Sequence, residues 1–400
     1  MQRIVTADPI CVTHLAMNKL TDQAIDILET LVGFDTTSRD SNLPLIHWVS
    51  DYLGKLGIQS TILTDPSGRK ANLFASTAPG DGGVVLSGHT DVVPVDGQDW
   101  HTDPFSLTRK GDQLFGRGSS DMKGFIACAL AAAPDMLKAG LSVPMHFAFS
   151  FDEEVGCLGV GSMIEHVLEQ GVRPAICLVG EPTMMKVVNA QKGCSVFHTT
   201  LTGREVHSSE THRGVNTVLY GAELIRFIDQ IAEERRQQPS ALFTPPYTTV
   251  HIGLMHGGTA VNIVPKQTEI RWEFRNVPED DGADIYPRVQ AFIDTDLLPR
   301  MRAVHPESSI ETVQICDVPG VLPEPDGAAE ALIKALVRSN ETEAVSYGTE
   351  GGLFQNAGMS TVICGPGSIG VAHQPNEFVD VEQISLCMDM FDRMLAHYAQ

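Results

Sequence analysis

The amino-acid sequence predicts an α/β protein: a doubly wound, mostly parallel sheet with a smaller ferredoxin-like α+β domain inserted into it. Three observations support this fold class. Apolar runs of strand length alternate with helical patterns in the first half of the chain. From Cys194 the order changes to strand, helix, strand, strand, helix, strand. The first pattern returns after the proline-rich stretch 322–325.

The length of the chain also favours two domains. Four hundred residues are more than one hydrophobic core of ordinary size fills, and 42% of them are apolar, which is enough for a large core. We expect a catalytic domain whose first segment is residues 1–192, an inserted domain at 193–320, and a second catalytic segment at 321–400.

The first half of the chain carries the alternating elements. A helix is expected to start at Thr21 or Asp22, either of which would act as its N-cap, and to stop at Gly33. A long alanine-rich helix is expected at 122–138. Three buried strands and a shorter helix complete the pattern, the strands at 84–87, 145–151 and 175–179 and the helix near 162–170. Strands that alternate with helices imply a parallel sheet covered on both faces.

The inserted domain has its own set of elements. Its four strands are expected at 194–201, 248–254, 269–274 and 309–316, and its two helices at 215–236 and 285–294. After this domain, a helix near 328–338 and a strand at 361–364 resume the first pattern.

Composition and charge exclude several classes of protein. The 50 acidic residues outnumber the 28 basic ones, and a net charge of −22 repels phosphate backbones and anionic membranes, so we expect neither a nucleic-acid nor a membrane partner. No apolar run reaches eighteen residues, and the N-terminus lacks the apolar core of a signal peptide. The eight cysteines form no Cys-x-x-Cys pair, which favours reduced core thiols and a cytoplasmic location.

His89 and Asp91 directly follow the first buried strand. Ligands of open α/β sheets gather at the carboxyl ends of the strands, which is where this pair is expected. Residues i and i+2 of an extended segment face the same way, so the carboxylate of Asp91 should reach the imidazole of His89. A metal-bound histidine usually donates its second ring N–H to such a carboxylate. The pair is compatible with a metal ligand, His89, oriented by a catalytic-site aspartate, Asp91, but a His-x-Asp at a strand end is weak evidence for a metal when taken alone.

Two further carboxylate motifs occupy similar positions. Asp121 opens a predicted helix, where a carboxylate is either a ligand or a cap for the free N–H groups. Glu153 and Glu154 follow the apolar strand 145–151, and adjacent carboxylates there repel one another unless a cation or a proton relieves them. Together the strand-end motifs predict metal-assisted chemistry.

Five ordered motifs resemble the M20 family of co-catalytic zinc amidohydrolases. The resemblance extends from Thr21 to the C-terminus, and it implies a zinc-peptidase-like fold whose inserted domain serves as a lid and for dimerisation. The motifs are SGHTDVVP at 87–94, GRGSSDMKG at 116–124, DEEVG at 152–156, GEPT at 180–183 and AHQPNE at 372–377. The five in this order are highly specific, whereas each alone is not.

The resemblance implies two zinc ions bridged by Asp121 and by a water or hydroxide. His89 and Glu181 would complete the protein ligands of one ion, and Glu154 and His373 those of the other. Three protein ligands per ion leave an open position, as a catalytic zinc requires. Cobalt and manganese suit the same imidazole and carboxylate ligands, so the sequence leaves the metal open.

The resemblance also assigns proton-transfer and oxyanion roles. Glu153 would be the general base, taking a proton from the attacking water and passing it to the leaving amine. His207, in the inserted domain, would donate to the oxyanion. The alternative for His207 is a surface histidine beside a turn, and residues 204–206 before it depart from the family pattern. In relatives this histidine reaches the partner's site, so a homodimer is implied, with action in cis or from the partner left open.

Asn262, Arg275 and Glu350 are the candidate substrate-binding residues. Asn262 would bond the oxyanion or the amide, and Arg275 would hold an α-carboxylate through a bidentate fork. Structural alternatives are an asparagine in a turn and an arginine paired with Asp280. Glu350, in a loop at 347–354 that resembles a pocket-lining loop of the family, is expected to face the side-chain ammonium of a cationic substrate.

Within the family, the resemblance points to members that hydrolyse N2-acetyl-L-ornithine to L-ornithine and acetate for arginine biosynthesis. Segments 156–159 and 348–350 favour this substrate over succinyl-diaminopimelate or a broader range of N-acyl amino acids and dipeptides. A catalytically silent binding protein is the alternative of another class. Segment 365–370 matches the dinucleotide pattern G-x-G-x-x-G, but too little chain follows it for a complete β-α-β unit.

Overall fold

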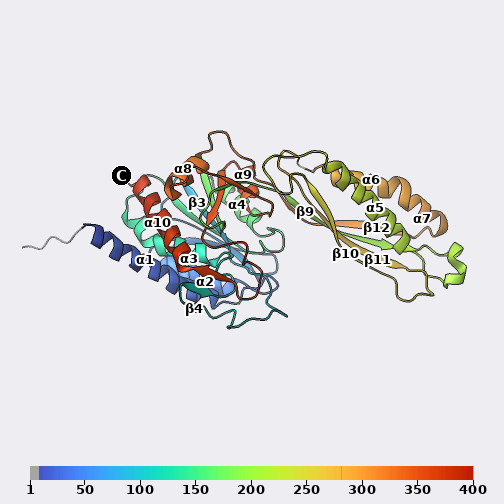
Figure 1. Ribbon diagram of the computed structural model, residues 1–400, viewed down its shortest axis with the longest axis horizontal. Coiled ribbons are helices and arrows are strands. Elements are labelled where there is room, and N and C mark those ends of the chain that lie inside the picture. Colours follow the sequence, from blue (N-terminus) through green and yellow to red (C-terminus); the bar gives the residue numbers. More distant parts are fainter. Residues whose placement is uncertain (1–8, 281, 400) are drawn as a thin grey trace, which may run out of the picture. The chain divides into compact units, whose positions relative to one another are not determined.

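Figure 1 shows the computed structural model, in which residues 9–280 and 282–399 are described, with side chains from residue 19 onward. The chain divides into two compact units. The first contains the described residues up to Asn189 together with Pro323–Glu343 and the chain from Thr349 onward, and the second contains Ala190–Leu322 and Ala344–Gly348. The short segment at 344–348 therefore belongs to the second unit, although it lies within the expected catalytic segment 321–400.

An eight-stranded sheet forms the centre of the first unit, and its middle strands are parallel, which confirms the predicted fold class. Strand β3 pairs in parallel with β6 on one side and with β7 on the other, and β14 pairs in parallel with β7. In sheet order the strands are β1 (Ser60–Thr64), β2 (Ala71–Ser76), β6 (Met145–Ser150), β3 (Val84–His89), β7 (Ile176–Pro182), β14 (Ser360–Gly365), β8 (Val188–Gln191) and β13 (Glu343–Val345).

Helices cover this sheet in two layers, as the alternation of elements predicts. The main core lies under one layer, where alanine-rich α3 packs between α1 and α10 and against β3 and β7. This layer consists of α1 (Pro9–Val32), α2 (Leu43–Lys55), α3 (Lys123–Lys138), α8 (Ala328–Val337) and α10 (Val381–Tyr398). The other layer consists of α4 (Val160–Glu169) and α9 (Gly351–Asn356). A small sheet of β4 (Thr108–Lys110), β5 (Gln113–Phe115) and β15 (Phe378–Asp380) lies beside them.

The first helix differs from the sequence prediction. It begins at Pro9, so the expected N-cap residues Thr21 and Asp22 lie inside it and Thr21 is buried. No glycine or proline between residues 10 and 20 stops a helix, and proline is favoured at the first helical position because it has no N–H to leave unpaired. The predicted end of the helix at Gly33 is right, because the last helical residue is Val32.

The second unit has the predicted ferredoxin-like order. Its sheet is antiparallel in the order β10-β11-β9-β12, and α5 packs against three of its strands. Phe197 and Trp272 stack at a centroid distance of 4.2 Å in the core beneath the helices. The elements are β9 (Cys194–Thr202), α5 (Thr217–Arg235), β10 (Thr249–Gly257), β11 (Gln267–Arg275), α6 (Ile285–Phe292), α7 (Leu298–Val304) and β12 (Ser309–Val318).

Three further sequence expectations are addressed by the structure. All seven cysteines with described side chains are buried free thiols, while the side chain of Cys11 lies outside the described set. Among the described residues, no helix has both the length and the apolar character that crossing a membrane requires. The glycine-rich segment 365–370 leads into turns and not into a helix, so it does not open a dinucleotide-binding β-α-β unit.

Candidate metal centre

Two neighbouring strands of the large sheet each end with a candidate ligand. His89 is the last residue of β3, and Glu181 lies near the end of β7. The preceding glycines face α3 so closely that a Cβ atom at Gly180 would lie 1.9 Å from the ring of Phe125, so no larger residue fits there. Because successive side chains of a strand point to opposite faces, His89 and Glu181 point away from α3.

Asp121 lies between two histidines that are far apart in the sequence. Its Oδ1 atom is 3.0 Å from Nε2 of His89, and its Oδ2 atom is 3.3 Å from Nε2 of His373. The alternative role of Asp121 as a helix cap is not observed, because α3 begins at Lys123 with Met122 in the N-cap position. One carboxylate therefore presents one oxygen to each histidine.

A second carboxylate accompanies each histidine. Oε1 of Glu181 is 3.7 Å from Nε2 of His89, and Oε2 of Glu154 is 2.9 Å from Nε2 of His373. Ligand atoms of His89, Asp121 and Glu154 all lie within 4.8 Å of one another. The five predicted ligands thus form two histidine–carboxylate pairs on either side of Asp121, which is the arrangement that two ions bridged by one carboxylate need.

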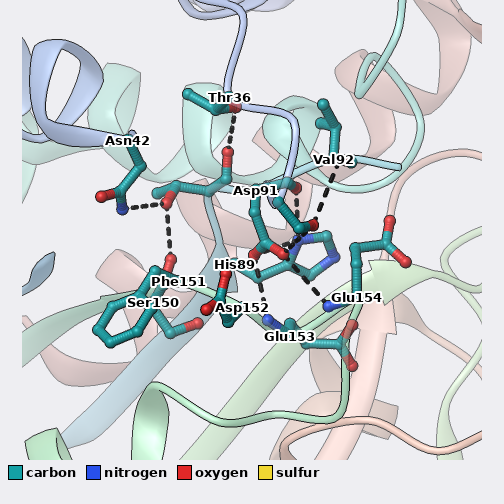
Figure 2. Close-up of polar contacts among 12 residues, drawn as sticks. Thr36, Asn42, His89, Asp91, Val92, Ser150, Phe151, Asp152, Glu153 and Glu154 are labelled. Carbon is teal, nitrogen blue, oxygen red and sulfur yellow. Dashed lines mark hydrogen bonds and ion pairs between the residues drawn. The ribbon is translucent and has the colours of Figure 1, made fainter. Parts of the chain in front are cut away.

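Figure 2 shows how the turn after β6 is held. The carboxylate of Asp91 accepts hydrogen bonds from the backbone N–H groups of Glu153, at 3.1 Å, and Glu154, at 3.3 Å. It also accepts a hydrogen bond of 2.7 Å from the hydroxyl of Ser38. Nζ of Lys70 lies 2.5 Å from Oδ1 of Asp152. Asp152 has a φ of 57°, which places it in the left-handed region. Asp91, Ser38 and Lys70 therefore fix the backbone that carries the two glutamates.

The contact between His89 and Asp91 differs from the prediction. Nδ1 of His89 lies 2.9 Å from the backbone carbonyl oxygen of Asp91 and 3.7 Å from its carboxylate, which is beyond hydrogen-bond distance. The carboxylate is engaged instead by the N–H groups of the glutamate turn. The consequence for His89 is the same, because an Nδ1–H that donates to a carbonyl leaves Nε2 to face the site.

Charge in this cluster is not balanced by the histidines. Burial raises the pKa of Glu181 and of Glu153 well above the usual range, and neighbouring carboxylates add to it. Burial would also raise the pKa of Asp121, but hydrogen bonds from His373 and His89 lower it overall. Hydrogen bonds to Asp121 and Glu154 raise the pKa of His373 to about 10. Crowded buried carboxylates of this kind are relieved by cations, and a mixed imidazole and carboxylate set fits divalent ions.

Glu153 lies beside the two histidine–carboxylate pairs and is not a member of either pair. Its ligand-type oxygen is within 4.8 Å of those of His89 and Glu181, and the thiol of Cys157 lies 3.4 Å from its Oε1 atom. Glu350, at the N-terminus of α9, is buried, accepts a hydrogen bond of 3.1 Å from Ser87, and has a pKa raised by burial to about 7. Both carboxylates are therefore close to the cluster without completing a histidine pair.

The remaining candidate residues lie in the second unit. His207 is exposed before a short 3₁₀ helix, and its Nδ1 atom accepts a hydrogen bond of 3.2 Å from the backbone of Ser209. Its segment pairs with that of Asn262, whose carbonyl accepts a hydrogen bond from Ser208. Arg275, at the end of β11, pairs with Glu273 at 3.0 Å.

One alternative for Arg275 is wrong. Asp280, its expected structural partner, is bound instead by Arg235 at 3.0 Å and by the hydroxyl of Thr248 at 2.8 Å. Arg275 reaches Glu273 because residues i and i+2 of a strand share a face. Ser38 and Lys70 have no predicted role, because the fold alone brings them to the turn that carries Glu153 and Glu154. A lysine whose charge pairs with a residue 82 positions away has no local signal.

Comparison with known proteins places this site in a family. Residues 85–397 match the profile of peptidase family M20/M25/M40. An acetylornithine deacetylase from Myxococcus xanthus is 33% identical over 390 residues, which cover 93% of this chain and 96% of that protein. An acetylornithine deacetylase from Pasteurella multocida is 31% identical over 371 residues, with coverage of 92% and 94%.

Solved structures share the fold at lower identity. An M20 family metallo-carboxypeptidase from Sulfolobus solfataricus aligns with a TM-score of 0.74 at 18% identity, covering 94% of this chain and 99% of that one. Human carnosine dipeptidase 1 aligns with a TM-score of 0.69 at 17% identity, with coverage of 96% and 98%. The sequence and fold matches together show that this chain belongs to peptidase family M20/M25/M40 and is a metal-dependent amidohydrolase.

Proposed function

We propose that this enzyme hydrolyses the acetyl amide of N2-acetyl-L-ornithine to L-ornithine and acetate, a step of arginine biosynthesis, with two divalent ions at the cluster around Asp121. The observation that carries the metal part is the position of Asp121, whose two oxygens face His89 and His373 separately. The substrate is supported by relatives named acetylornithine deacetylase that match over more than nine-tenths of both chains.

The ligand set has two halves in this proposal. His89 and Glu181 would hold one ion, Glu154 and His373 would hold the other, and Asp121 would bind both. Zinc is the ion that we propose, although cobalt and manganese bind the same atoms. When bound, the ions supply Lewis acidity to the amide carbonyl and lower the pKa of a water molecule.

Glu153 is the proposed general base. It takes the proton of the water whose oxygen forms the new bond to the carbonyl carbon, and it returns that proton to the amine as the C–N bond breaks. Its position supports this role, because it lies beside the cluster on a turn fixed by Asp91 and is not needed to complete either histidine pair. Asp91 in turn holds the glutamate turn and, through its carbonyl, the ring of His89.

Residues of the second unit complete the proposal. His207 donates to the oxyanion, Asn262 binds the oxyanion or the amide, and Arg275 binds the α-carboxylate, which its planar guanidinium suits. The exposure of His207 and Asn262 and their adjacent backbone segments are compatible with these roles. The lid and dimerisation function of this unit, the homodimer and the cytoplasmic location stay predictions.

A panel of substrates tests the proposed function. Released amine is measured with N2-acetyl-ornithine, succinyl-diaminopimelate, other acetyl and formyl amino acids and a dipeptide, each with and without chelator. The expected result is the highest kcat/KM with N2-acetyl-ornithine and no turnover with chelator. A higher value for the succinyl compound or the dipeptide would reassign the substrate, and no hydrolysis by metal-loaded protein would favour a binding protein.

Glu350 is proposed to recognise the side-chain ammonium of the substrate. The ammonium would replace Ser87 as a partner of this buried carboxylate, and a charge-assisted hydrogen bond contributes about 1.5 kcal/mol or more. In Glu350→Gln, the preference for acetylornithine over acetylnorvaline should fall by about tenfold. The exposed Glu341→Gln is the matched control. An unchanged preference in Glu350→Gln would remove this role and leave the proposed reaction intact.

A further inference from the structure

A buried ion pair lies beside the metal centre without belonging to it. Arg117 and Glu377 are each 1% exposed, and Nη1 of Arg117 is 2.6 Å from Oε2 of Glu377. Arg117 precedes α3, and Glu377 ends the segment that carries His373, 260 positions later in the chain. Burying such a pair costs free energy unless further hydrogen bonds complete it, so its other contacts indicate what it holds in place.

Glu377 holds the backbone at Asp121. Its Oε1 atom accepts hydrogen bonds from the backbone N–H groups of Ser120, at 2.9 Å, and Asp121, at 3.0 Å. Its own carbonyl accepts a hydrogen bond of 3.0 Å from Gly116. Both carboxylate oxygens of Glu377 are therefore in use, one on Arg117 and one on the loop whose aspartate faces both histidines.

Arg117 reaches the segment of His373 directly, through a hydrogen bond of 3.4 Å from Nη1 to the carbonyl of Gln374, and also through Gln98. Its Nη2 atom donates to Oε1 of Gln98 at 2.6 Å, and Nε2 of Gln98 donates to the backbone carbonyl of His373 at 2.9 Å. The guanidinium also lies over the ring of Trp100, at 5.2 Å from its centroid. His373 has a φ of 63°, a left-handed conformation that an L-residue adopts only when its surroundings favour it.

We propose that Arg117, Glu377 and Gln98 are positioning residues, which hold Asp121 and His373 in the geometry of the two ions before either ion binds. This inference rests on the proposed two-ion site. Glu377 acts on both ions because it fixes Asp121, whereas Gln98 acts only on the ion that His373 and Glu154 hold. Residues that orient metal ligands in this way typically change metal affinity by 10- to 100-fold when they are replaced.

Metal affinity of the substrate-free protein provides the test. Chelator-treated protein is titrated with Zn²⁺ alone by calorimetry, and the absorption spectrum of the Co²⁺-loaded protein reports ligand geometry. Glu377→Gln places an amide donor against either Arg117 or the two backbone N–H groups, so one of these contacts is lost. Arg117→Lys keeps the charge but lacks the fork that spans Glu377 and Gln98. Gln98→Ala removes the link to His373, together with the acceptor of Nη2 of Arg117 and of the indole N–H of Trp100, and it leaves the contact between Arg117 and Glu377 in place.

The expected pattern distinguishes the three variants. Glu377→Gln should lower the affinity for both Zn²⁺ ions by about 10- to 100-fold and change the Co²⁺ spectrum. Arg117→Lys should have the same effects to a smaller extent. Gln98→Ala, which changes one partly exposed side chain and leaves the ion pair in place, should weaken only one of the two binding events. Folding of each variant is checked by its thermal unfolding without metal.

A matched control separates positioning from stability. Arg235→Lys disturbs another largely buried ion pair, that with Asp280, and it should lower Tm without changing either affinity for Zn²⁺. Wild-type affinities and spectra in Glu377→Gln and Arg117→Lys would overturn the inference, whatever their Tm values. If Gln98→Ala weakened the binding of both Zn²⁺ ions equally, the proposal that Gln98 acts on only one of the two ions would be wrong. If the wild type bound fewer than two Zn²⁺, the proposed two-ion site itself would be wrong, and the inference with it.

Discussion

The interior of the second unit and the metal centre of the first unit bury charge in opposite ways. In the second unit, Arg235 pairs with Asp280 and Asp284, and the larger part of the interior is aromatic and aliphatic, with Phe197 stacked on Trp272. At the metal centre of the first unit, a group of carboxylates around Asp121 faces two histidines, His89 and His373, and no other histidine among the residues with described side chains pairs with Asp121.

The difference shows what each arrangement is for. A balanced buried pair holds a fold together, whereas a surplus of buried carboxylates destabilises it unless an ion or a proton is taken up. Surplus charge at the carboxyl ends of parallel strands therefore indicates a functional site, and balanced charge elsewhere does not. The following predictions test this contrast.

Removal of metal should have the largest effect. Chelation should abolish hydrolysis completely, because the ions supply the Lewis acidity, and added Zn²⁺, Co²⁺ or Mn²⁺ should restore it. Activity and metal content by mass spectrometry are measured on the same samples, with circular dichroism as a check of folding. Full activity in protein shown to be free of metal would contradict the assignment of metal-dependent hydrolysis to the first unit.

Replacement of the general base should have the next largest effect. Glu153→Gln should lower kcat by about 10²- to 10⁴-fold, because the amide cannot accept the proton of the attacking water. Metal content should be unchanged, since Glu153 completes neither histidine pair. Glu165→Gln, an exposed glutamate on α4, is the control. Retention of full activity by Glu153→Gln would contradict the assignment of the base.

A core substitution in the second unit should affect stability and leave the metal centre unchanged. Phe197→Ala removes a buried ring that also contacts Phe274 and Tyr286, and it should lower the free energy of unfolding by about 3–5 kcal/mol. The measurements are denaturant unfolding and calorimetric titration with Zn²⁺. A loss of Zn²⁺ affinity as large as that caused by replacing a metal ligand would contradict the claim that the core of the second unit acts on stability alone.

The smallest expected effect is the release of protons when the metal ions bind. The pKa of His373, which hydrogen bonds to Asp121 and Glu154 raise to about 10, means that this ring is protonated at pH 7 in the metal-free protein. For His373 the resulting stabilisation is fully present below about pH 6.5 and is lost as the pH rises through 10. Because an ion binds the neutral ring of His373 and the ionised forms of Glu154 and Glu181, whose pKa values burial raises, metal uptake should release protons and should tighten as pH rises.

Calorimetry in two buffers with different ionisation enthalpies measures this release. The apparent enthalpy of Zn²⁺ binding should differ between the buffers by the number of protons released multiplied by the difference between the two ionisation enthalpies. Identical enthalpies in the two buffers would show that no net proton is released and would contradict the protonation of His373 in the metal-free protein.

Much of the site could be predicted from the sequence because its ligands follow apolar strands. His89, Glu153 and Glu154 come directly after buried runs, and the strand order brings the ends of β3, β6 and β7 together. The C-terminal helix α10 was not among the predicted elements, although its buried residues at helical spacing were a sufficient signal, with Ile384, Cys387, Phe391 and Met394 on one face.

Other features depend on contacts that no local pattern contains. Arg117 and Glu377 lie inside recognisable motifs, but their pairing joins residues 260 positions apart and appears only in the folded chain. The use of a backbone carbonyl by His89, where a carboxylate was expected, depends on how the turn at Glu153 competes for Asp91. Such competition between partners is decided by tertiary structure, and spacing alone does not reveal it.

Anomalous X-ray diffraction from crystals of the Zn²⁺-loaded enzyme tests the central claim most directly. The account predicts two zinc peaks, one bound by His89 and Glu181 and the other by His373 and Glu154, with one oxygen of Asp121 on each. A single peak, or two peaks without Asp121 between them, would contradict it.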